Sequence, residues 1–323
     1  MYKRQGEQIT QIAVWAYKPT QTSQELGLIL TDIGFITDTG FMPFYDYQDA
    51  KEKIEWLHSH YIKNIIVYNQ IWIESVDPLR IVKTDHTLSD EELIFVYSLL
   101  REGAAAMPLT NSLQRIFLEA GVAYVSDINN LNREWIDEYF RQLRGYVLRY
   151  GELFETIGVK RYLLESGPMF AFRVMNPQTK AYIERKWRDL IAAVREVYAG
   201  EIGLSDFVYM SNTFYPNRDY NLLRDVDFLS VAIYPLYCHD VNCNAPEIQN
   251  TVENLLWQIA RYKIYFPNIK YIIVRLNAFS FTDAILGNLP PETEGRFSMD
   301  EIDVNFQVQV RILEGVLLSL IHI

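Results

Sequence analysis

Short apolar runs that alternate with longer helical patterns constrain the fold of this chain most strongly. Seven runs rich in β-branched and aromatic residues are predicted strands: QIAVWAY from 11, NIIVYNQIWI from 64, AAAMPLT from 104, VKRYLLES from 159, FVYMSN from 207, FLSVAIYPLY from 228 and YIIVRLNAF from 271. Between them the apolar spacing changes to about 3.6 residues, the period of an amphipathic helix. Strands that are apolar on both faces and joined by helices indicate a parallel sheet covered by helices.

Two stretches between the runs have the clearest helical spacing. One carries Ile136, Phe140, Leu143, Val147, Tyr150, Phe154 and Ile157 and ends at Gly158. The other carries Ile183, Trp187, Leu190, Ile191, Val194 and Val197 and ends at Gly200. A further helix is predicted after Ser89 and Glu92, which have the spacing of a capping box. We interpret these stripes as the core-facing sides of helices.

The number of strand and helix units favours a (β/α)8 TIM-type barrel over a dinucleotide-binding fold. No G-x-G-x-x-G sequence follows any of the runs, so no cofactor is predicted. A last helical pattern consists of Phe306, Val310, Leu313 and Leu317, and it runs directly into residues 318–323, which we expect not to be native. The sequence therefore predicts a barrel that is truncated before strand eight, which would leave one edge of the first run and one edge of the seventh run unpaired.

The two ends of the chain are related at the level of DNA. Residues 318–322, Leu-Ser-Leu-Ile-His, can be encoded by CTG TCT CTT ATA CAC, whose reverse complement encodes the opening Met-Tyr-Lys-Arg-Gln when GTG is the start codon. Both ends thus match a common transposon adapter read in its two orientations. We predict that residues 1–5 and 318–323 are not native and that residues 6–317 form the barrel fragment.

Composition excludes several classes of function. A formal net charge of −11 without a concentrated basic patch argues against nucleic acid as a partner. No run approaches the ~18 to 20 apolar residues of a membrane span. Cys238 and Cys243 could be two free thiols or could form a small loop disulfide. Metal binding by these cysteines together with His239 and Asp240 is the weakest of the three interpretations, because the spacing is not that of a zinc site. We predict no metal site, and the oligomeric state stays open.

The residues at or just past the run ends would form the site, because the carboxyl ends of barrel strands carry the active site. The candidates are Trp15, Tyr17, Asn69, Trp72, Glu74, Asn111, Asp127, Glu165, Asn212, Tyr234, Tyr237, Arg275 and Asn277. Aromatic faces stack on sugar rings, while amides and carboxylates bind hydroxyl groups. A saccharide site is therefore the functional interpretation. In the alternative interpretation, the aromatic residues only close the core.

The order of several segments is similar to glycoside hydrolase family 113. These segments are TLSDEEL from 87, EYFRQLRGYVLRYGELFETIGVKRYLL from 138, KWRDLIAAVREVYAG from 186, FVYMSN from 207 and DVDFLSVAIYPLY from 225. The resemblance spans about residues 10 to 317. It implies a β-mannanase-like barrel that acts on β-linked polysaccharide, with an acid/base Glu after strand four and a nucleophilic Glu after strand seven. An extracellular or periplasmic location would be compatible with the resemblance.

The chain departs from the pattern at both expected catalytic positions. The family's Gly-Thr-Glu ending of strand four places Gly167 at the acid/base position, and Glu165 lies two residues earlier. The family's strand-seven ending falls on RLNAF, which places Leu276, or Asn277 after a slip of one residue, at the nucleophile position. Neither side chain can attack an anomeric carbon. The next carboxylate, Asp283, lies several residues further on.

Three interpretations of Glu165 remain open. It is a relocated acid/base residue, a ligand of sugar hydroxyls or ion-pair partner of Arg275, or a surface carboxylate. Retaining hydrolysis needs two carboxyl groups ~5 to 5.5 Å apart. The sequence therefore predicts a glycan-binding pseudoenzyme, with an active retaining glycosidase that uses Glu165 as the alternative.

Overall fold

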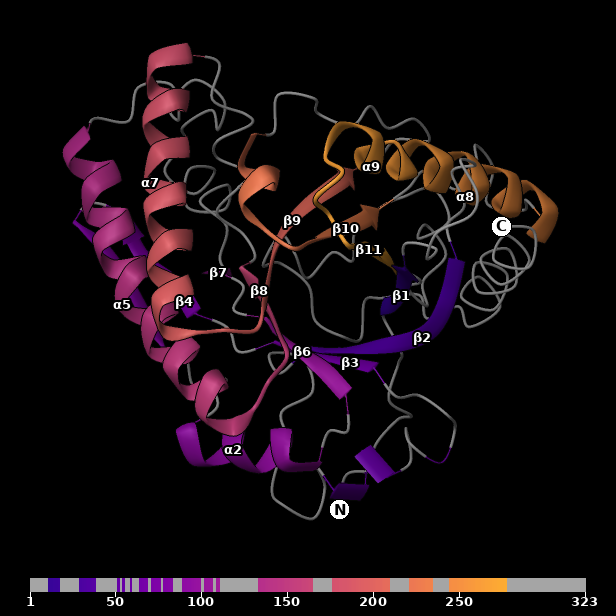
Figure 1. Ribbon diagram of the computed structural model, residues 1–323, viewed down its shortest axis with the longest axis horizontal. Coiled ribbons are helices and arrows are strands. Elements are labelled where there is room, and N and C mark those ends of the chain that lie inside the picture. The colour runs from indigo at the N-terminus through magenta and orange to yellow at the C-terminus, as the bar shows by residue number, and fades with distance from the viewer. Residues whose placement is uncertain are drawn as a thin grey trace, which may run out of the picture. The chain divides into compact units, whose positions relative to one another are not determined.

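The computed structural model describes residues 11–17, 29–38, 51–52, 54–55, 59, 64–68, 71–76, 78–83, 89–99, 102–106, 109–110, 133–164, 176–209, 221–234 and 244–277. The chain divides into two compact units (Figure 1). The first, which we call the α5–α7 unit, comprises residues 37–206 and 220–229. The second, the α8 unit, comprises residues 1–36, 207–219 and 230–323. The fold is of the α/β class with a parallel sheet.

A parallel sheet forms the centre of the α5–α7 unit. Its hydrogen-bonded order is β3 (Asn64–Tyr68), β6 (Glu102–Ala106), β8 (Arg161–Leu164) and β9 (Glu201–Tyr209). The described pairs β3–β6, β6–β8 and β8–β9 are all parallel. Tyr162, Leu163 and Leu164 of β8 are all buried, so both faces of this strand are covered. The expected parallel sheet is therefore confirmed here.

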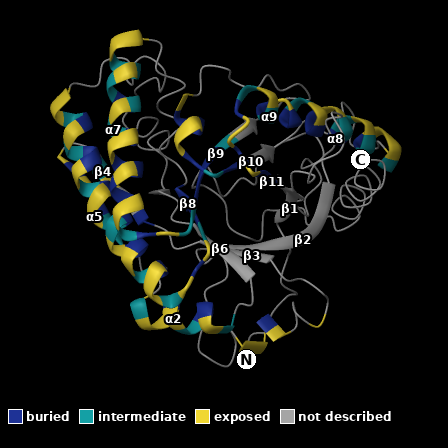
Figure 2. Ribbon diagram, in the orientation of Figure 1, coloured by how far each residue is buried: buried dark blue, intermediate teal, exposed yellow. Residues whose placement is uncertain are grey.

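Two long helices, α5 (Arg133–Ile157) and α7 (Pro177–Val197), precede and follow β8 and run side by side (Figure 1). Each has one buried and one exposed face (Figure 2). The buried residues of α5 include Ile136, Phe140, Leu143, Val147, Tyr150 and Phe154, as its apolar spacing predicts. Those of α7 include Ile183, Trp187, Leu190, Ile191 and Val194. Burial of each such side chain contributes roughly 1.5 to 3 kcal/mol, so these stripes hold the helices in place.

Aromatic rings connect the two helices to the sheet. The ring of Phe140 meets that of Trp187 edge-on, with centroids 5.4 Å apart. Phe154 lies edge-on to Tyr162 of β8 at 5.1 Å, and Tyr162 lies edge-on to Tyr198 at 5.8 Å. These edge-to-face pairs add a directional contribution to the burial of apolar area. A functional reading of these aromatic residues is unnecessary.

At two positions of the α5–α7 unit, only glycine fits the backbone conformation or the available space. Gly158 follows α5 with a φ of 75°, in the left-handed region that glycine adopts without strain. A Cβ atom on Gly203 of β9 would overlap the ring of Phe228. The positive φ confirms the expected helix end at Gly158. The α7 helix ends at Val197, and Tyr198 rather than Gly200 is its capping residue.

A small second sheet in the same unit was not predicted. Its order is β5 (Leu79–Lys83), β4 (Ile71–Val76) and β7 (Leu109–Thr110), and β4 pairs antiparallel with β5. The run from 64 is therefore two strands, β3 and β4, in different sheets, and the run from 104 is likewise divided between β6 and β7. Between β5 and β6 lies α2 (Asp90–Leu99), which begins with the predicted capping box. The Ser89 N–H donates to Glu92 Oε2 at 2.7 Å, and the Glu92 N–H donates to Ser89 Oγ at 3.2 Å.

Strands in the α8 unit are partly antiparallel, which corrects the expected arrangement. β1 (Gln11–Tyr17) pairs antiparallel with β11 (Tyr271–Asn277) on one side and with β2 (Ile29–Asp38) on the other. The prediction that all seven runs lie parallel is wrong for β1. The first and seventh runs also pair with each other, so the expectation of unpaired edges there is wrong. Only residues 18–28 separate β1 from β2, and a parallel crossover needs a dozen or more residues.

Helices α8 (Ala245–Ala260) and α9 (Tyr262–Tyr265) lie between β10 (Phe228–Tyr234) and β11 in the chain. A capping box of Asn244 and Glu247 begins α8. Its inner face buries Ile248, Val252, Leu255, Leu256 and Ile259. Within the parts of the chain that the structure describes, no helix combines the length and apolarity that crossing a membrane requires. The predicted last helix, from 306 to 317, lies outside the described residues.

Candidate functional site

The carboxyl ends of three neighbouring strands lie level in the α5–α7 unit. Tyr68, the last residue of β3, is in register with Ala106, the last residue of β6. Ala106 is in register with Leu163, one residue before β8 ends. In a parallel α/β sheet, such a row of strand ends is where ligand-binding loops begin. The residues that follow these strands are therefore the natural site candidates.

Two of the predicted site residues follow this row directly in the sequence. Asn69 comes immediately after β3, and Glu165 comes immediately after β8. Both lie outside the described residues, as does Asn212, three residues beyond the end of β9. The register thus indicates that β3 and β8, the strands that precede Asn69 and Glu165, end at the same edge of the sheet. Their roles stay predictions.

The end of β11 carries no carboxylate. This strand runs from Tyr271 to Asn277, and its last three residues are Arg275, Leu276 and Asn277. Tyr271 to Val274 are buried, which anchors the strand in the core of the α8 unit. For the last three residues the structure describes only the backbone.

The antiparallel course of β1 separates Trp15 from the end of β11. Trp15 pairs with Ile273 and Tyr17 pairs with Tyr271, whereas Asn277 pairs with Gln11 at the other end. The expected common rim of strand ends is therefore wrong for β1. The proposed contact of Trp15 with sugar is untested, since its side chain lies outside the description.

The remaining candidates lie on two further strands. Trp72 and Glu74 lie inside β4, in the small second sheet, rather than beyond the end of a strand of the main sheet. The Glu74 carboxylate is exposed and forms an ion pair with Arg80 of β5 at 2.8 Å. Such exposed pairs contribute little to stability. Tyr234 is the last residue of β10, and its side chain, like that of Trp72, is not described.

Described polar contacts gather at the opposite, amino ends of β8 and β9. Arg195 donates to Asp227 at 2.5 Å, and Asp227 also accepts the N–H of Ile202 at 2.9 Å. Arg161 and Glu201, the first residues of β8 and β9, form an ion pair at 3.7 Å. The hydroxyl of Tyr198 donates to the Val159 carbonyl at 2.8 Å, and burial raises its pKa. In barrel folds this end serves stability, so we interpret these contacts as structural.

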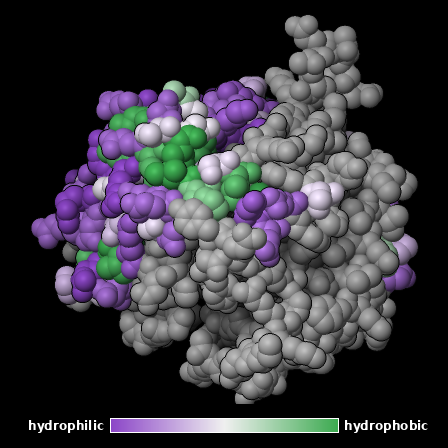
Figure 3. Space-filling view, turned by 90° about the horizontal axis from the view of Figure 1, so that it is seen from below, coloured by the Kyte–Doolittle hydropathy of each residue, from purple (hydrophilic) through white to green (hydrophobic). Residues whose placement is uncertain are grey.

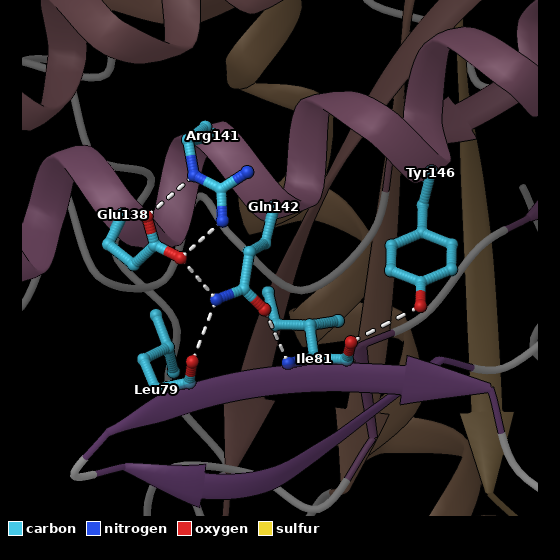
Figure 4. A network of polar contacts seen from close by, with 6 residues as sticks. All are labelled: Leu79, Ile81, Glu138, Arg141, Gln142 and Tyr146. Atoms are coloured by element: carbon cyan, nitrogen blue, oxygen red, sulfur yellow. Dashed lines mark hydrogen bonds and ion pairs between the residues drawn. The ribbon is translucent and has the colours of Figure 1, made fainter.

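A second polar network joins α5 to the edge strand β5 (Figure 4). The side-chain amide of Gln142 accepts from the N–H of Ile81 and donates to the Leu79 carbonyl, both at 2.7 Å. The Tyr146 hydroxyl donates to the Ile81 carbonyl at 3.2 Å. These bonds satisfy backbone groups of a strand that has a neighbour on only one side in its sheet. Sequence reasoning missed this role, because a half-buried Gln on a helix has no distinctive local pattern.

The same network holds a carboxylate in its charged form. Glu138 accepts two hydrogen bonds from Arg141 and one from Gln142. The Arg141 hydrogen bonds, followed by that of Gln142, lower the pKa of Glu138 from 4.5 to about 2. This group is exposed and remote in sequence from every strand end, so it is not a candidate acid. Among the described residues, no group of three His, Cys, Asp or Glu side chains could hold a metal ion, and Cys238 and Cys243 lie outside them.

Comparison with known proteins identifies the family. No curated protein sequence matches the chain. The structure is similar to a GH113 beta-1,4-mannanase (TM-score 0.53, 16% identity, 84% of this chain and 78% of that one) and to a complex of a GH113 beta-1,4-mannanase (0.55, 17%, 84% and 77%). A GH113 beta-mannanase from Alicyclobacillus acidocaldarius in complex with ManMIm gives a TM-score of 0.51 at 13% identity, over 84% of this chain and 76% of that one. The model of Glycoside Hydrolase Family 113 matches residues 34–267, well over half of the sequence, and the chain belongs to this family.

Proposed function

We propose that this chain binds a β-linked, mannan-type polysaccharide at the carboxyl ends of the strands of a (β/α)8-type barrel and hydrolyses it slowly or not at all. Family membership supports the ligand class, because the similar solved structures are described as beta-mannanases. The parallel order of β3, β6, β8 and β9 within the α5–α7 unit supports the barrel. Family and fold do not by themselves decide catalysis, which depends on the residues at the strand ends.

The main observation behind this proposal is that β11 ends without a carboxylate. Retaining hydrolysis uses one carboxylate as nucleophile and a second carboxyl group as acid. The segment Arg275–Leu276–Asn277 supplies a cation, an apolar side chain and an amide. None of these can form the covalent glycosyl intermediate that a carboxylate nucleophile forms. A chain with this strand end keeps groups that recognise hydroxyls and lacks a nucleophile there.

Glu165 then has a binding role in the proposal. It follows β8 directly, at the edge where Asn69 follows β3. A carboxylate can accept hydrogen bonds from two sugar hydroxyls, and an arginine such as Arg275 would keep it ionised and unsuited to donate a proton. Asn69, Asn212, Tyr234 and Asn277 would supply further hydrogen bonds and stacking. These assignments rest on sequence position and residue chemistry.

The second candidate function is an active retaining glycosidase. Membership of a hydrolase family favours it. It requires Glu165 as the acid/base residue and a nucleophile from another position, of which Asp283 is the nearest in sequence after β11. The two candidates differ in one measurable property, the release of reducing ends from a β-1,4-mannan.

The experiment combines calorimetric titration with mannohexaose and an assay for reducing ends. We expect binding by the wild type, little or no hydrolysis, and weaker binding by Glu165→Gln. The control is Glu152→Gln, which removes an exposed carboxylate of α5. Absence of binding would overturn the proposal. Robust hydrolysis that Glu165→Gln abolishes and Glu152→Gln preserves would establish the active enzyme instead.

A further inference from the structure

The outer face of α8 and α9 carries an exposed row of side chains that the strand-end site does not include. We call Asn250, Asn254, Trp257, Arg261 and Ile264 the α8 stripe. Their spacing of three and four residues places them on one side of the helical segment, and all are exposed. Trp257 is 57% exposed and Ile264 is 54% exposed. An exposed Trp in the last turn of a regular helix is unusual, since Trp is highly buried on average.

Core packing and local hydrogen bonds hold the stripe in place. Leu255, Leu256 and Ile259, on either side of Trp257 in sequence, are buried. Beside Trp257, the Gln258 amide donates to Asn254 Oδ1 at 2.9 Å. One turn further on, Arg261 donates to the Tyr265 hydroxyl at 3.2 Å. A rigid aromatic face with polar groups on both sides loses little conformational entropy when it binds a ligand.

We propose that the α8 stripe is a second binding site for a neutral β-linked polysaccharide, with Trp257 stacking on a sugar ring. The C–H face of a pyranose matches the flat apolar face of an indole ring. The amide and guanidinium groups along the stripe would hydrogen-bond the hydroxyls at the edges of neighbouring sugars. The identity of the ligand rests on the function proposed above, and the existence of the site rests on α8 itself.

Charge favours a neutral polymer over other partners. The stripe contains one cation, Arg261, and no carboxylate. The nearby Glu253 carboxylate accepts the Gln249 amide at 2.7 Å, and Glu247 belongs to the capping box. An anionic polymer would meet a single cation on a chain of net charge −11. A strongly basic partner would find no acidic row on this face.

Area argues against a second copy of the chain as the occupant. Stable protein interfaces bury about 800 Å² per partner around an apolar centre. Trp257 and Ile264 are the two large apolar side chains of the stripe, and each is only about half exposed. A side chain of this size buries roughly 150 to 250 Å² in full. On the differently oriented face in Figure 3, hydrophobic residues likewise form only separate patches within the described surface.

Trp257, the centre of the stripe, lies away from the end of α8 that follows β10. Trp257 is twelve residues beyond Ala245, the first residue of α8, which corresponds to about 18 Å along the helix axis. A ligand of a few sugars at the strand end would not also cover Trp257. A long polymer could occupy the stripe while another part of it, or another molecule, occupies the strand-end site. Short oligosaccharides and insoluble polymer therefore distinguish the two sites.

The test measures retention of the full 323-residue chain on insoluble β-1,4-mannan, beside solution titration with mannotetraose. We expect Trp257→Ala to reduce retention about fivefold to tenfold, the effect of losing one stacked ring. Trp257→Phe, which keeps a flat ring, should restore most of it, and Trp257→Leu, which keeps only apolar bulk, should not. The matched control is Trp135→Ala, which removes a half-buried Trp of α5. Melting curves confirm that each variant is folded.

Each outcome supports or overturns the site. Loss of retention in Trp257→Ala and Trp257→Leu, with retention in Trp257→Phe and Trp135→Ala, supports it. Equal retention of all variants, or no retention of the wild type, overturns it. A halved mass of Trp257→Ala in light scattering would identify a second copy as the occupant and also overturn it. Failure of the strand-end function shows separately, as a mannotetraose titration without heat.

Discussion

The N–H of Ile81 in β5 donates to the side-chain amide oxygen of Gln142 in α5, across 61 positions of sequence, at 2.7 Å. The same amide donates to the Leu79 carbonyl, so one side chain serves as the missing neighbour of an edge strand. The bond ties the small second sheet to the helix that leads into β8. Gln142 is therefore one of the contacts that hold this sheet, which includes Trp72 and Glu74 in β4, against α5.

Replacing Gln142 should destabilise the chain more than its exposure suggests. We expect Gln142→Ala to lower the free energy of unfolding by about 1 to 3 kcal/mol, because it leaves a donor and an acceptor of β5 without partners. The measurement is urea denaturation followed by circular dichroism. Arg141→Ala, the exposed neighbour, is the control and should change stability by less than about 1 kcal/mol. Equal effects of the two variants would contradict the role of Gln142.

The Glu138 network should make stability depend on pH at the acid end. The Arg141 and Gln142 hydrogen bonds lower the Glu138 pKa in the folded chain from 4.5 to about 2. A lowered folded pKa stabilises the fold above the unfolded pKa, near 4.5, and this contribution disappears as pH falls towards 2. We expect the urea midpoints of the wild type and Glu138→Gln to differ at pH 6 and to converge by pH 2.

An NMR titration of the Glu138 carboxyl carbon checks the cause directly. Its midpoint should lie near pH 2 in the wild type and rise towards the ordinary value in Arg141→Ala, since Arg141 is the main cause of the shift. Glu134→Gln, an exposed carboxylate of the same helix, controls for a change of charge on α5. An unchanged Glu138 midpoint in Arg141→Ala would refute this explanation.

Gly145 inside α5 and Gly158 just after it should respond in opposite directions to the same substitution. Gly158 has a φ of 75°, so Gly158→Ala should destabilise by about 1 kcal/mol through backbone strain. Gly145 lies inside the helix, and a Cβ atom there would have open space. Gly145→Ala should therefore stabilise by about 0.5 to 1 kcal/mol. The measurement is the thermal melting temperature of both variants. If both substitutions raise it, or both lower it, the backbone conformation of the glycine does not determine the change in stability.

Carboxylates placed at the two departures from the family pattern should create activity. If Gly167 and Leu276 occupy the acid/base and nucleophile positions, Gly167→Glu combined with Leu276→Glu supplies the pair that retention requires. We expect measurable release of reducing ends from β-1,4-mannan by the double variant and less by either single variant. The control pair, Gly167→Gln with Leu276→Gln, has the same size without charge. Activity of the wild type equal to that of the double variant would mean that the chain uses other carboxylates.

Local sequence predicted the helices well for a physical reason. The stripes of α5 and α7 and the Ser89 and Glu92 capping box depend on residues within one or two turns of each other, so their pattern is complete in the local sequence. Each of the seven apolar runs overlaps a strand, although the run from 207 holds only the end of β9, which begins at Glu201. Family membership was also predictable, because it depends on the order of such segments along most of the chain.

Pairing partners were not predictable in the same way. The pattern of β1 gives no direction relative to a neighbour, and its antiparallel pairing with β11 joins segments more than 250 residues apart. The hairpin of β4 and β5 had one usable signal, the Asp77–Pro78 turn sequence after β4, which could have predicted a turn before a further strand at 79–83. β2 was missed because its alternation of Thr, Asp and Gly with apolar residues lacks a continuous apolar run.

The sequence by itself determined where the long helices and most strands of the main sheet form and which side chains follow the strand ends, including the absence of a carboxylate at Arg275–Leu276–Asn277. Both depend on the order of residues alone. The tertiary structure decided that β1 runs antiparallel to β11, that Trp72 and Glu74 belong to a separate hairpin, and that Gln142 completes an edge strand. These relationships depend on hydrogen bonds between distant backbone groups, whose partners are set by packing of the whole unit rather than by any local pattern.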